Sequence, residues 1–575
     1  MATSKDVSWA IADAMRGEAG ATDSYALTCI AAMLSEMDVT PAGNMDPDSA
    51  IRSAIEQLSQ HDSDVCDYLS DAVRHLSQRG KLELLCLAAS FDAEDLHEAV
   101  LLGPAVQGID AASSATPESV VKLALAILEP KVDDSVLDLC SGRGDFLTAV
   151  AMACPMAKCT GVEINPNARA IAKLRSPAAM RRIDYRRGDV LDGYGNYGIS
   201  FNATKAFSNF PWGMRTSDLV RNAPWINVFD KVKAGYNRPV SADWVFARVL
   251  IDSIEKDGLA VGVMANGAMF NSTDAKVRKH FVENGWIKAV VALPDGLFSP
   301  LTGIGTSLVV MAHDCGDSVR MVDATDLGEK QRRTVTLTDE AIDEIVRRLN
   351  GDTDRSATLT HEELAEANYD LHAARYLQKD LDVPRPIKFG TIIKSMTRGA
   401  SVRAAELDQL TCREDTGISY LMLSSIEDGV ISADLPNIRE LDPKLEKYCV
   451  KNGDLVISKI APFKIAVAEV PEGRKVLANG NVHVVSLVEG ADPYYVAAFL
   501  SSAVGMRELN LIAKGTAMKT INAADVKGLV VPDEDEERKA KVAAIYRAKL
   551  DEIQVYKLGL ERARAELSDL FGEGA

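Results

Sequence analysis

Strand-like and helix-like segments alternate along residues 109 to about 315. The alternation begins with the helical stretch "PESVVKLALAILEP", the apolar run "SVLDLC", the helix "LTAVAMAC" and the strand "AKCTGVEI". Strands that alternate with helices at this spacing indicate a parallel sheet with helices on both faces. We therefore predict a doubly wound, Rossmann-like α/β domain over residues 109–378.

Outside these residues the pattern of apolar and turn-forming residues is different. Residues 1–108 carry apolar side chains at three- and four-residue spacings without strand-like alternation, which predicts an N-terminal helical domain. Residues 379–531 contain short β-rich runs broken by the turn-prone "KNGD", "PEGRK" and "ANGN", which predict an α+β domain. Several domains are expected because 575 residues exceed what one hydrophobic core usually covers.

Residues 532–575 predict one long amphipathic helix that ends the chain. Its apolar residues follow a heptad spacing, which is typical of a coiled coil. Such a seam needs a partner helix, so we expect a homodimer. The seam residues are Tyr546, Ile553, Leu560 and Leu567, with Tyr556, Ala563 and Leu570 three positions after the last three.

The stretch "PDEDEERK" at 532–539 is similar to the acidic P-D…E-x-K pattern of nucleases. We predict no strand that would present these acids, and we interpret them as the start of the long helix, where the helix dipole favours negative charge. DNA cleavage would then have to come from a separate restriction subunit.

A glycine-containing turn, "LDLCSGRGDF", follows the first predicted strand. Gly142 and Gly144 permit unusual backbone angles and let a ligand approach the main chain, and the following helix offers free N–H groups. Glu163 lies 21 residues after Gly142, at the end of the next predicted strand, where a carboxylate can accept both hydroxyls of a ribose. This pattern predicts a site for a nucleoside cofactor.

Two cofactor families share this plan, the dinucleotide oxidoreductases and the methyltransferases that use S-adenosylmethionine. The dinucleotide fingerprint requires a third glycine where this chain has Leu147, so the methyltransferases fit better. Asp189, in "RRGDVLD" at the third strand end, is placed to accept a hydrogen bond from an adenine amino group. The alternative for Asp189 is a turn or helix-capping aspartate.

The fourth predicted strand ends in "AFSNFPWGMR", which either closes off a core or forms a pocket for a flat polar ring. The tetrad Asn209, Phe210, Pro211 and Trp212 resembles the N/D/S-P-P-F/Y/W motif of methyltransferases that modify the exocyclic nitrogen of adenine or cytosine in DNA. The resemblance implies that the Asn209 side-chain oxygen and the Phe210 carbonyl accept the two amine hydrogens. It also implies that Pro211 holds the turn and that Trp212 stacks on the extruded base. Phe210 stands where the family usually has proline, which leaves the loop less stiff.

Residues 1 to about 375 are similar to the modification subunits of type I restriction-modification systems. The segment "SSATPESVVKLALAIL" resembles the methionine-side cofactor segment that precedes the glycine turn in the γ arrangement of these enzymes. The resemblance implies N6 methylation of adenine in double-stranded DNA with S-adenosylmethionine as cofactor. The implied cofactor residues are Thr116, Pro117, Asp138, Cys140, Gly142, Gly144, Glu163, Asp189 and Asn209.

The C-terminal part resembles half of a type I specificity subunit. The similarity lies in "NGDLVISKIAPFKIAVAEV", in "KGTAMKTINAADVKGLVVPDEDEERKAKVAAIY" and in the long helix that follows. It implies a target-recognition domain that grips DNA through phosphate contacts, for which solvated side chains on loops are the alternative interpretation. The implied contacts are Lys459, Lys464, Lys514, Thr516 and Lys519.

The net charge of −19 excludes DNA binding driven by overall charge and leaves room for a locally basic cleft. The nine cysteines are scattered without a C-x-x-C pair, so no metal site is expected and the thiols should be reduced. The chain start lacks a signal peptide and no window approaches a membrane span, so we expect a cytoplasmic protein.

Two other functions stay open on the sequence. The same tetrad occurs in methyltransferases that act on RNA or on protein glutamine, although the C-terminal half argues for DNA. A DNA-binding or assembly subunit without turnover is the second alternative, and Phe210 is the feature that favours it. The recognition sequence cannot be derived from the chain, and adenine rather than cytosine rests on the resemblance alone.

Overall fold

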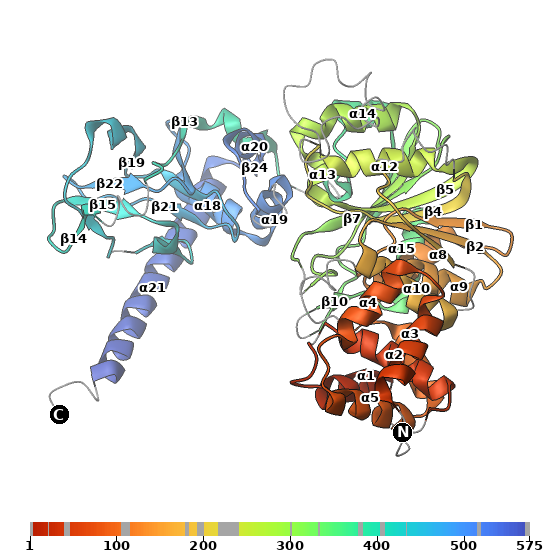
Figure 1. The fold of residues 1–575 in the computed structure, drawn as a ribbon. Coiled ribbons are helices and arrows are strands. Elements are labelled where there is room, and N and C mark those ends of the chain that lie inside the picture. Colours follow the sequence, from red (N-terminus) through yellow and green to blue (C-terminus); the bar gives the residue numbers. More distant parts are fainter. Residues whose placement is uncertain are drawn as a thin grey trace. The chain divides into compact units, whose positions relative to one another are not determined.

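The chain divides into two compact units, residues 1–377 and 378–575, which we call the N-terminal unit and the C-terminal unit. Figure 1 shows the elements of each unit. The structure is a computed structural model, and it describes residues 4–20, 22–39, 46–104, 115–178, 183–191, 201–216, 241–299, 302–331, 334–377, 383–402, 409–432, 434–513 and 519–569.

The N-terminal unit begins with a bundle of helices. Asp46, Asp62, Ser77 and Asp92 each cap the start of one helix by accepting backbone N–H bonds. The bundle core extends to Ile171 and its neighbours on a later helix, α10 (Pro166–Ala178), so the bundle packs on the sheet region that follows. The helices are α1 (Ser4–Ala14), α2 (Ser24–Glu36), α3 (Pro47–Ser59), α4 (Ser63–Val73), α5 (Gln78–Ser90) and α6 (Ala93–Leu102).

A nine-stranded sheet forms the centre of this unit, in the order β11-β8-β6-β7-β5-β4-β1-β2-β3. Strands β3, β2, β1, β4 and β5 are parallel, which confirms the predicted α/β class with a large parallel region. In contrast to the prediction, β7 and β11 run antiparallel to their neighbours. The strands are β1 (Ser135–Asp138), β2 (Lys158–Glu163), β3 (Ile183–Arg187), β4 (Ala203–Asn209), β5 (Ile254–Ala265), β6 (Ile287–Ala292), β7 (Thr306–Met311), β8 (Ser318–Asp323) and β11 (Ser356–Thr360), with a separate ribbon of β9 (Glu329–Lys330) and β10 (Val335–Thr336).

Helices cover both faces of the sheet, as Figure 1 shows. One core contains Trp244 of α12 and Phe281 of α14, and the other contains Val120 of α8, Phe146 of α9 and Ile345 of α15. These buried apolar faces hold the layers together. The helices are α8 (Glu118–Leu128), α9 (Asp145–Ala153), α10 (Pro166–Ala178), α12 (Ala242–Asp252), α13 (Asn266–Phe270), α14 (Ala275–Glu283), α15 (Asp339–Asn350) and α16 (His361–Glu366), with short 3-10 turns η2 (Ser272–Asp274) and η3 (Ala373–Arg375).

The strand order reverses at β1. The chain leaves β1 for β2 on one side, and β4 later pairs with β1 on the other side. Ligands of doubly wound sheets bind outside the carboxyl ends of the strands at such a reversal. Asp138 and Asn209 are the last residues of β1 and β4, so both lie at this point.

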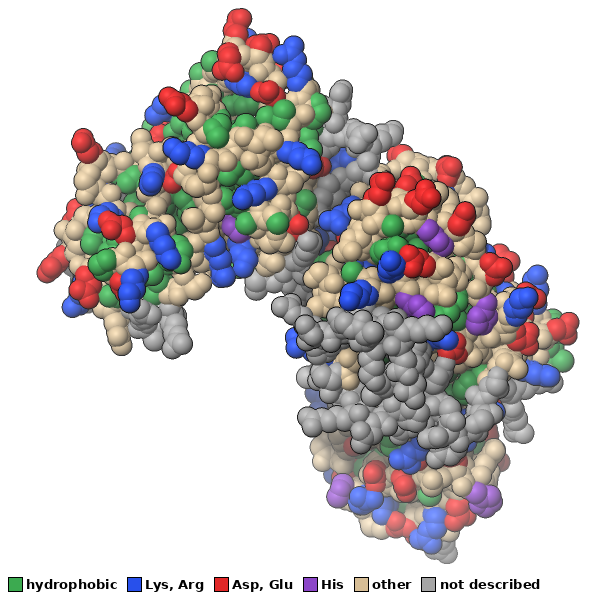
Figure 2. All heavy atoms as spheres, turned by 90° about the horizontal axis from the view of Figure 1, so that it is seen from above, with side chains coloured by type: hydrophobic (Ala, Val, Ile, Leu, Met, Phe, Trp, Pro, Cys, Tyr) green, Lys and Arg blue, Asp and Glu red, His purple; other side chains and the backbone are tan. Residues whose placement is uncertain are grey.

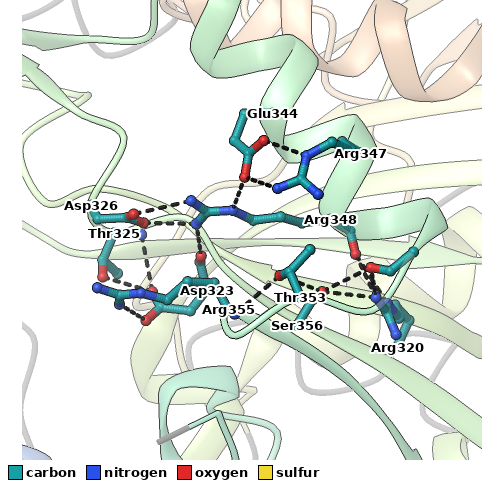
Figure 3. A network of polar contacts seen from close by, with 11 residues as sticks. Arg320, Asp323, Thr325, Asp326, Glu344, Arg347, Arg348, Thr353, Arg355 and Ser356 are labelled. Atoms are coloured by element: carbon teal, nitrogen blue, oxygen red, sulfur yellow. Dashed lines mark hydrogen bonds and ion pairs between the residues drawn. The ribbon is translucent and has the colours of Figure 1, made fainter.

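A network of charged side chains connects α15 to the sheet near the edge that is formed by β11 and β8 (Figure 3). Arg348 of α15 is 6% exposed. Its guanidinium donates to Glu344 at 2.7 Å, to Asp326 at 2.8 Å and to the Asp323 carbonyl at 2.5 Å. The network joins α15 to the end of β8.

The C-terminal unit contains a four-stranded sheet, β13-β23-β20-β21, a five-stranded sheet, β14-β18-β15-β22-β19, and the pairs β12-β24 and β16-β17. The strands are β12 (Pro386–Lys388), β13 (Ile393–Arg398), β14 (Thr411–Cys412), β15 (Ile418–Leu421), β16 (Ile426–Glu427), β17 (Val430–Ile431), β18 (Asn437–Ile438), β19 (Cys449–Val450), β20 (Leu455–Ser458), β21 (Ile465–Val467), β22 (Lys475–Ala478), β23 (Val482–Leu487) and β24 (Val530–Pro532). The helices are α18 (Pro493–Ser501), α19 (Ala503–Ile512), α20 (Ala523–Gly528) and α21 (Glu536–Asp569), with 3-10 turns η4 (Phe389–Thr391), η5 (Leu423–Ser425) and η6 (Pro443–Tyr448).

The long helix α21 contacts its own unit from its start as far as Lys557. The Tyr546 hydroxyl lies 3.1 Å from the Ser501 hydroxyl of α18, and Lys557 pairs with Asp428 at 2.9 Å. Tyr556 and Leu560, on this later part of the helix, are nevertheless 67% and 51% exposed. The predicted seam is therefore divided, because Tyr546 packs within the unit while Tyr556 and Leu560 face solvent. Leu570 lies outside the described residues.

A short strand, β24, precedes the acidic stretch at 532–539, although none was predicted there. It pairs with β12 at the start of the same unit. Lys539 lies 2.6 Å from Asp533 and 3.1 Å from Glu536, so these acids are neutralised at the start of α21.

Candidate active site

The glycine turn after β1 closes on the end of β2. Gly142 and Gly144 have φ angles of 52° and 81°, a left-handed conformation that favours glycine. The Gly142 N–H donates to Glu163 Oε2 at 2.8 Å. A Cβ on Gly144 would lie 2.3 Å from the Tyr185 hydroxyl, so this glycine is also required by packing against β3.

Glu163 has both carboxylate oxygens engaged by the backbone. Oε2 accepts from Gly142 and Oε1 accepts from the Asn165 N–H at 2.7 Å. A carboxylate offers about four acceptor sites, so each oxygen can accept a further hydrogen bond. The backbone thus fixes the carboxylate while leaving acceptors for a ligand.

Asp138 and Cys140 lie where β1 passes into the glycine turn. Asp138 is 2% exposed and accepts the Cys140 N–H at 3.2 Å. Burial raises the pKa of Asp138 well above its ordinary value, and the neighbouring Glu163 and Asp145 carboxylates add to the effect. Burial also raises the pKa of the Cys140 thiol, which makes a thiolate there unfavourable.

Asp189 follows β3 in a partly exposed turn. Its Oδ1 accepts the Leu191 N–H at 2.9 Å, which is the local turn contact that the sequence left as the alternative. This contact engages one carboxylate oxygen and leaves Oδ2 to accept a hydrogen bond from a ligand. Asp189 can therefore serve the turn and still present an acceptor at this edge of the sheet.

Asn209 ends β4 and lies against the segment that precedes α8. Its Nδ2 donates to Thr116 Oγ1 at 3.2 Å. Its Oδ1 is buried and has no hydrogen-bond partner among the described residues. An unpaired buried acceptor costs about 1–3 kcal/mol, so this oxygen is poised for a donor that the described part of the chain does not provide. Pro117 follows Thr116 as the residue before α8.

The other tetrad residues divide between core and surface. The Phe210 ring is 2% exposed and stacks on Phe246 at 5.6 Å, so it belongs to the core beneath the loop. Pro211 is exposed. Trp212 is half-buried, donates its indole N–H to the Val263 carbonyl at 3.2 Å and meets Phe298 edge-on at 4.5 Å.

Asp145 was not predicted as a site residue from the sequence. In the structure it contacts the segment of Thr116 and two arginines beside the glycine turn. Its Oδ2 accepts the Thr116 N–H at 3.1 Å, and its carboxylate pairs with Arg143 at 3.0 Å and Arg175 at 2.7 Å. Burial opposes its ionisation, but the two guanidinium groups outweigh burial and hold its pKa below the ordinary value. Its position after Gly144 was visible in the sequence, whereas Arg175 on α10 could be paired with it only in three dimensions.

The predicted DNA contacts are only partly brought together. An antiparallel bridge between Ile460 and Thr520 places Lys459 and Lys519 on adjacent segments. Lys464 Nζ instead donates to the Leu423 carbonyl at 3.2 Å. Lys514 and Thr516 lie outside the described residues. Figure 2 shows Lys and Arg side chains interspersed with acidic ones on the visible face of the C-terminal unit.

Arg398 is a basic residue that the sequence interpretation missed. It lies at the end of β13 and donates to the Gly480 carbonyl at 2.7 Å. The buried His483 lies near both Arg398 and Lys459, and its pKa is lowered chiefly by burial and further by these charges. Arg398 and Lys459 therefore share one neighbourhood.

Among the residues that the structure describes, no three His, Cys, Asp or Glu side chains are grouped so that they could hold a metal ion. Within the same ranges, no helix has the length and apolar character needed to cross a membrane.

Residues 105–382 match the family model described as N-6 DNA Methylase. The chain is similar to the type I restriction enzyme MpnII methylase subunit of Mycoplasma pneumoniae, with 24% identity over 297 residues, which cover 46% of this chain and 53% of the relative. It is also similar to the type I restriction enzyme MjaVIII methylase subunit of Methanocaldococcus jannaschii, with 29% identity over 213 residues, 34% of this chain and 36% of the relative. The chain thus spans about half or less of the length of these relatives.

A solved structure shares the fold. It is the type I restriction-modification system methyltransferase subunit from Streptococcus thermophilus, with a TM-score of 0.51 and 17% identity, covering 65% of this chain and 100% of that chain. The relatives confirm the similarity to type I modification subunits. The similarity of the C-terminal unit to half a specificity subunit stays a prediction.

Proposed function

We propose that the protein is a DNA methyltransferase that transfers a methyl group from S-adenosylmethionine to N6 of an adenine flipped out of duplex DNA. The observation that carries the proposal is the position of Asn209. This residue ends β4 at the reversal of strand order, beside the glycine turn, and its buried Oδ1 lacks a partner among the described residues. The matches to N-6 DNA methylases and to type I methylase subunits support the same reaction.

The residues at the strand ends fit the cofactor. Glu163 retains acceptors for the ribose hydroxyls, and Asp189 Oδ2 is available for the adenine amino group. Thr116 and Pro117 would border the methionine end, next to Asp145. The cofactor, when bound, supplies the methyl group on a positively charged sulfur, and the chain's task is to place the acceptor nitrogen beside it.

The tetrad would orient the target amine. An amine conjugated to a purine is a poor nucleophile, so two hydrogen-bond acceptors that draw its hydrogens away favour attack by the nitrogen. Asn209 Oδ1 and the Phe210 carbonyl would provide these acceptors, and Trp212 would stack on the base. Most of the acceleration would come from positioning, without a general base of shifted pKa.

The C-terminal unit would supply target recognition. Arg398, Lys459 and Lys519 would contact DNA phosphates, and base contacts would come from loops of the same unit. One recognition unit reads one half-site, so pairing of two chains through the exposed part of α21 would read a two-part site. A separate restriction subunit would supply any cleavage.

Sequencing of host DNA with modification-sensitive reads, with and without the gene, tests the proposal. We expect N6-methyladenine within one sequence motif only in cells that carry the gene. Identical modification in both strains would contradict the proposal. Methylated cytosine or methylated RNA in place of methyladenine would show that the same site acts on another substrate.

A further inference from the structure

The turn after the tetrad is held by the start of α12. The Ala242 N–H donates to the Met214 carbonyl at 2.9 Å, and Arg215 forms an antiparallel bridge with Ser241. The backbone that leaves Trp212 therefore runs beside the backbone that enters α12. Whatever fixes the first turn of α12 also fixes the exit of the tetrad.

Asp243 lies at the centre of this contact and is 1% exposed. Its Oδ1 accepts the Ala265 N–H at 3.2 Å, and its Oδ2 accepts the Ser241 hydroxyl at 2.5 Å. Both oxygens of the carboxylate are thus engaged, one at the start of α12 and one at the end of β5. The side chain joins these two elements, and the start of α12 in turn holds the backbone that follows the tetrad.

The end of β5 is itself part of the tetrad's support. Asn209 is paired in register with Val263 of β5, and the Val263 carbonyl accepts the Trp212 indole N–H at 3.2 Å. Ala265 follows two residues later on the same strand. Asp243 therefore anchors the start of α12, and with it the Met214 and Arg215 backbone, to the same strand that contacts Asn209 and Trp212.

A role in helix capping alone does not explain Asp243. Ser241 already caps α12, since its hydroxyl also lies 3.3 Å from the Asp243 N–H. The helix dipole would stabilise a carboxylate in the first turn of α12 at an exposed position too, and an exposed carboxylate would not pay the cost of burial. Burial raises the pKa of Asp243, and the hydrogen bonds that the carboxylate accepts lower it by less. Burying the ionised carboxylate at this position is therefore unfavourable for the fold. Gly213 has a φ of 74°, and no atom of the described residues would lie within 4 Å of a Cβ added to it, so its conformation depends on how the neighbouring Met214 is held.

We propose that Asp243 is a positioning residue of the methyl-transfer site, which joins the start of α12 to the end of β5 and thereby holds the backbone that leaves the tetrad, so that Asn209 and Trp212 face the target amine. This inference rests on the proposed function. It adds a residue that lies 34 positions after Asn209 in the chain and belongs to another element.

The test compares Asp243→Asn and Asp243→Ala with the wild-type full chain, using labelled S-adenosylmethionine and DNA from a host that lacks the gene. The asparagine side chain of D243N would keep the volume and one acceptor, so the fold should persist. A misplacement of about 1 Å in a reacting group can cost about 100-fold in rate. We expect kcat to fall about 10- to 100-fold for D243N and further for D243A, with KM for both substrates within about threefold.

Two further measurements separate positioning from folding. Calorimetry should show that D243N binds S-adenosylmethionine with unchanged stoichiometry. Asp252→Asn is the matched control, because Asp252 lies at the other end of α12, where it pairs with Arg248 at 2.9 Å. Its kcat should remain near that of the wild type.

The outcomes are distinct. Retention of wild-type kcat by D243N would overturn the inference, and so would a loss of cofactor stoichiometry in proportion to kcat, since that indicates a general role in folding. An equal loss in D252N would overturn it as well. Absence of methylation by the wild-type chain would instead contradict the proposed function.

Discussion

Phe210 and Gly262 fit one another in the core beneath the tetrad. A Cβ on Gly262 would lie 2.8 Å from the Phe210 ring, and the ring also stacks on Phe246. The sequence marks Phe210 as a departure from the family motif that leaves the loop less stiff. In the structure the ring is buried, so packing replaces part of the constraint that proline would impose.

This pair gives a prediction for stability at the residue scale. Gly262→Ala should destabilise the wild-type chain by about 2 kcal/mol, because the added methyl overpacks against the ring. In a Phe210→Ala background the same change should be nearly neutral, since the obstructing ring is gone. Denaturant unfolding of the four variants measures the coupling. Additive effects of the two substitutions would show that the ring does not occupy this space.

At the level of single elements, two neighbouring arginines of α15 differ in how deeply their side chains are buried against the edge of the sheet. Arg347 and Arg348 both pair with Glu344, but the Arg347 side chain is 62% exposed and that of Arg348 is 7% exposed. Figure 3 shows Arg348 directed between Glu344 and Asp326. Arg348 also reaches the Asp323 carbonyl of β8, so α15 depends on it.

We expect Arg348→Met to destabilise the N-terminal unit by about 2 kcal/mol, because it leaves the buried Asp323 carbonyl without its side-chain donor. Arg347→Met is the matched control and should leave the melting temperature unchanged, since exposed ion pairs contribute little. Thermal unfolding of both variants decides the matter. Equal melting temperatures for the two variants would contradict this account of the network.

Strand ends were predictable from the sequence, whereas pairings between distant elements were not. The apolar runs and the glycine turn identified β1, β2 and β4 and the polar residues at their ends. The antiparallel direction of β7 depends on which strands flank it, which local patterns do not encode. The hydrogen bond between Ala242 and Met214 and the pairing of Asp145 with Arg175 likewise join segments that are distant in sequence. A heptad count could not distinguish Tyr546, which packs on α18, from Tyr556, which faces solvent.

At the scale of the whole molecule, the exposed apolar residues of α21 indicate where a second chain would bind. Val555, Tyr556, Leu558 and Leu560 are 65%, 67%, 46% and 51% exposed on the part of α21 beyond its contact with α18. Burying such side chains against a partner helix is favourable at about 25 cal/mol per Å² of apolar surface. The prediction of a homodimer therefore rests on this second half of the helix.

Light scattering of the full chain, with and without DNA, tests the pairing. We expect a dimer for the wild type and a monomer for Tyr556→Glu combined with Leu560→Glu, because the introduced charges would be buried in the seam. Lys541→Glu, at an exposed position near the start of α21, should remain dimeric. A wild-type monomer at micromolar concentration under both conditions would contradict the pairing.

Methyl transfer by the Asn209→Ala variant tests the role of the tetrad amide in the reaction. Purified chain, S-adenosylmethionine and DNA from a host without the gene are incubated, and N6-methyladenine is quantified by mass spectrometry. Asn284→Ala, an exposed amide in the same unit, is the control. We expect N209A to lose about 100-fold or more of the rate while the wild type and N284A methylate adenine equally well. Full N6-methyladenine formation by N209A would contradict the proposed role of Asn209.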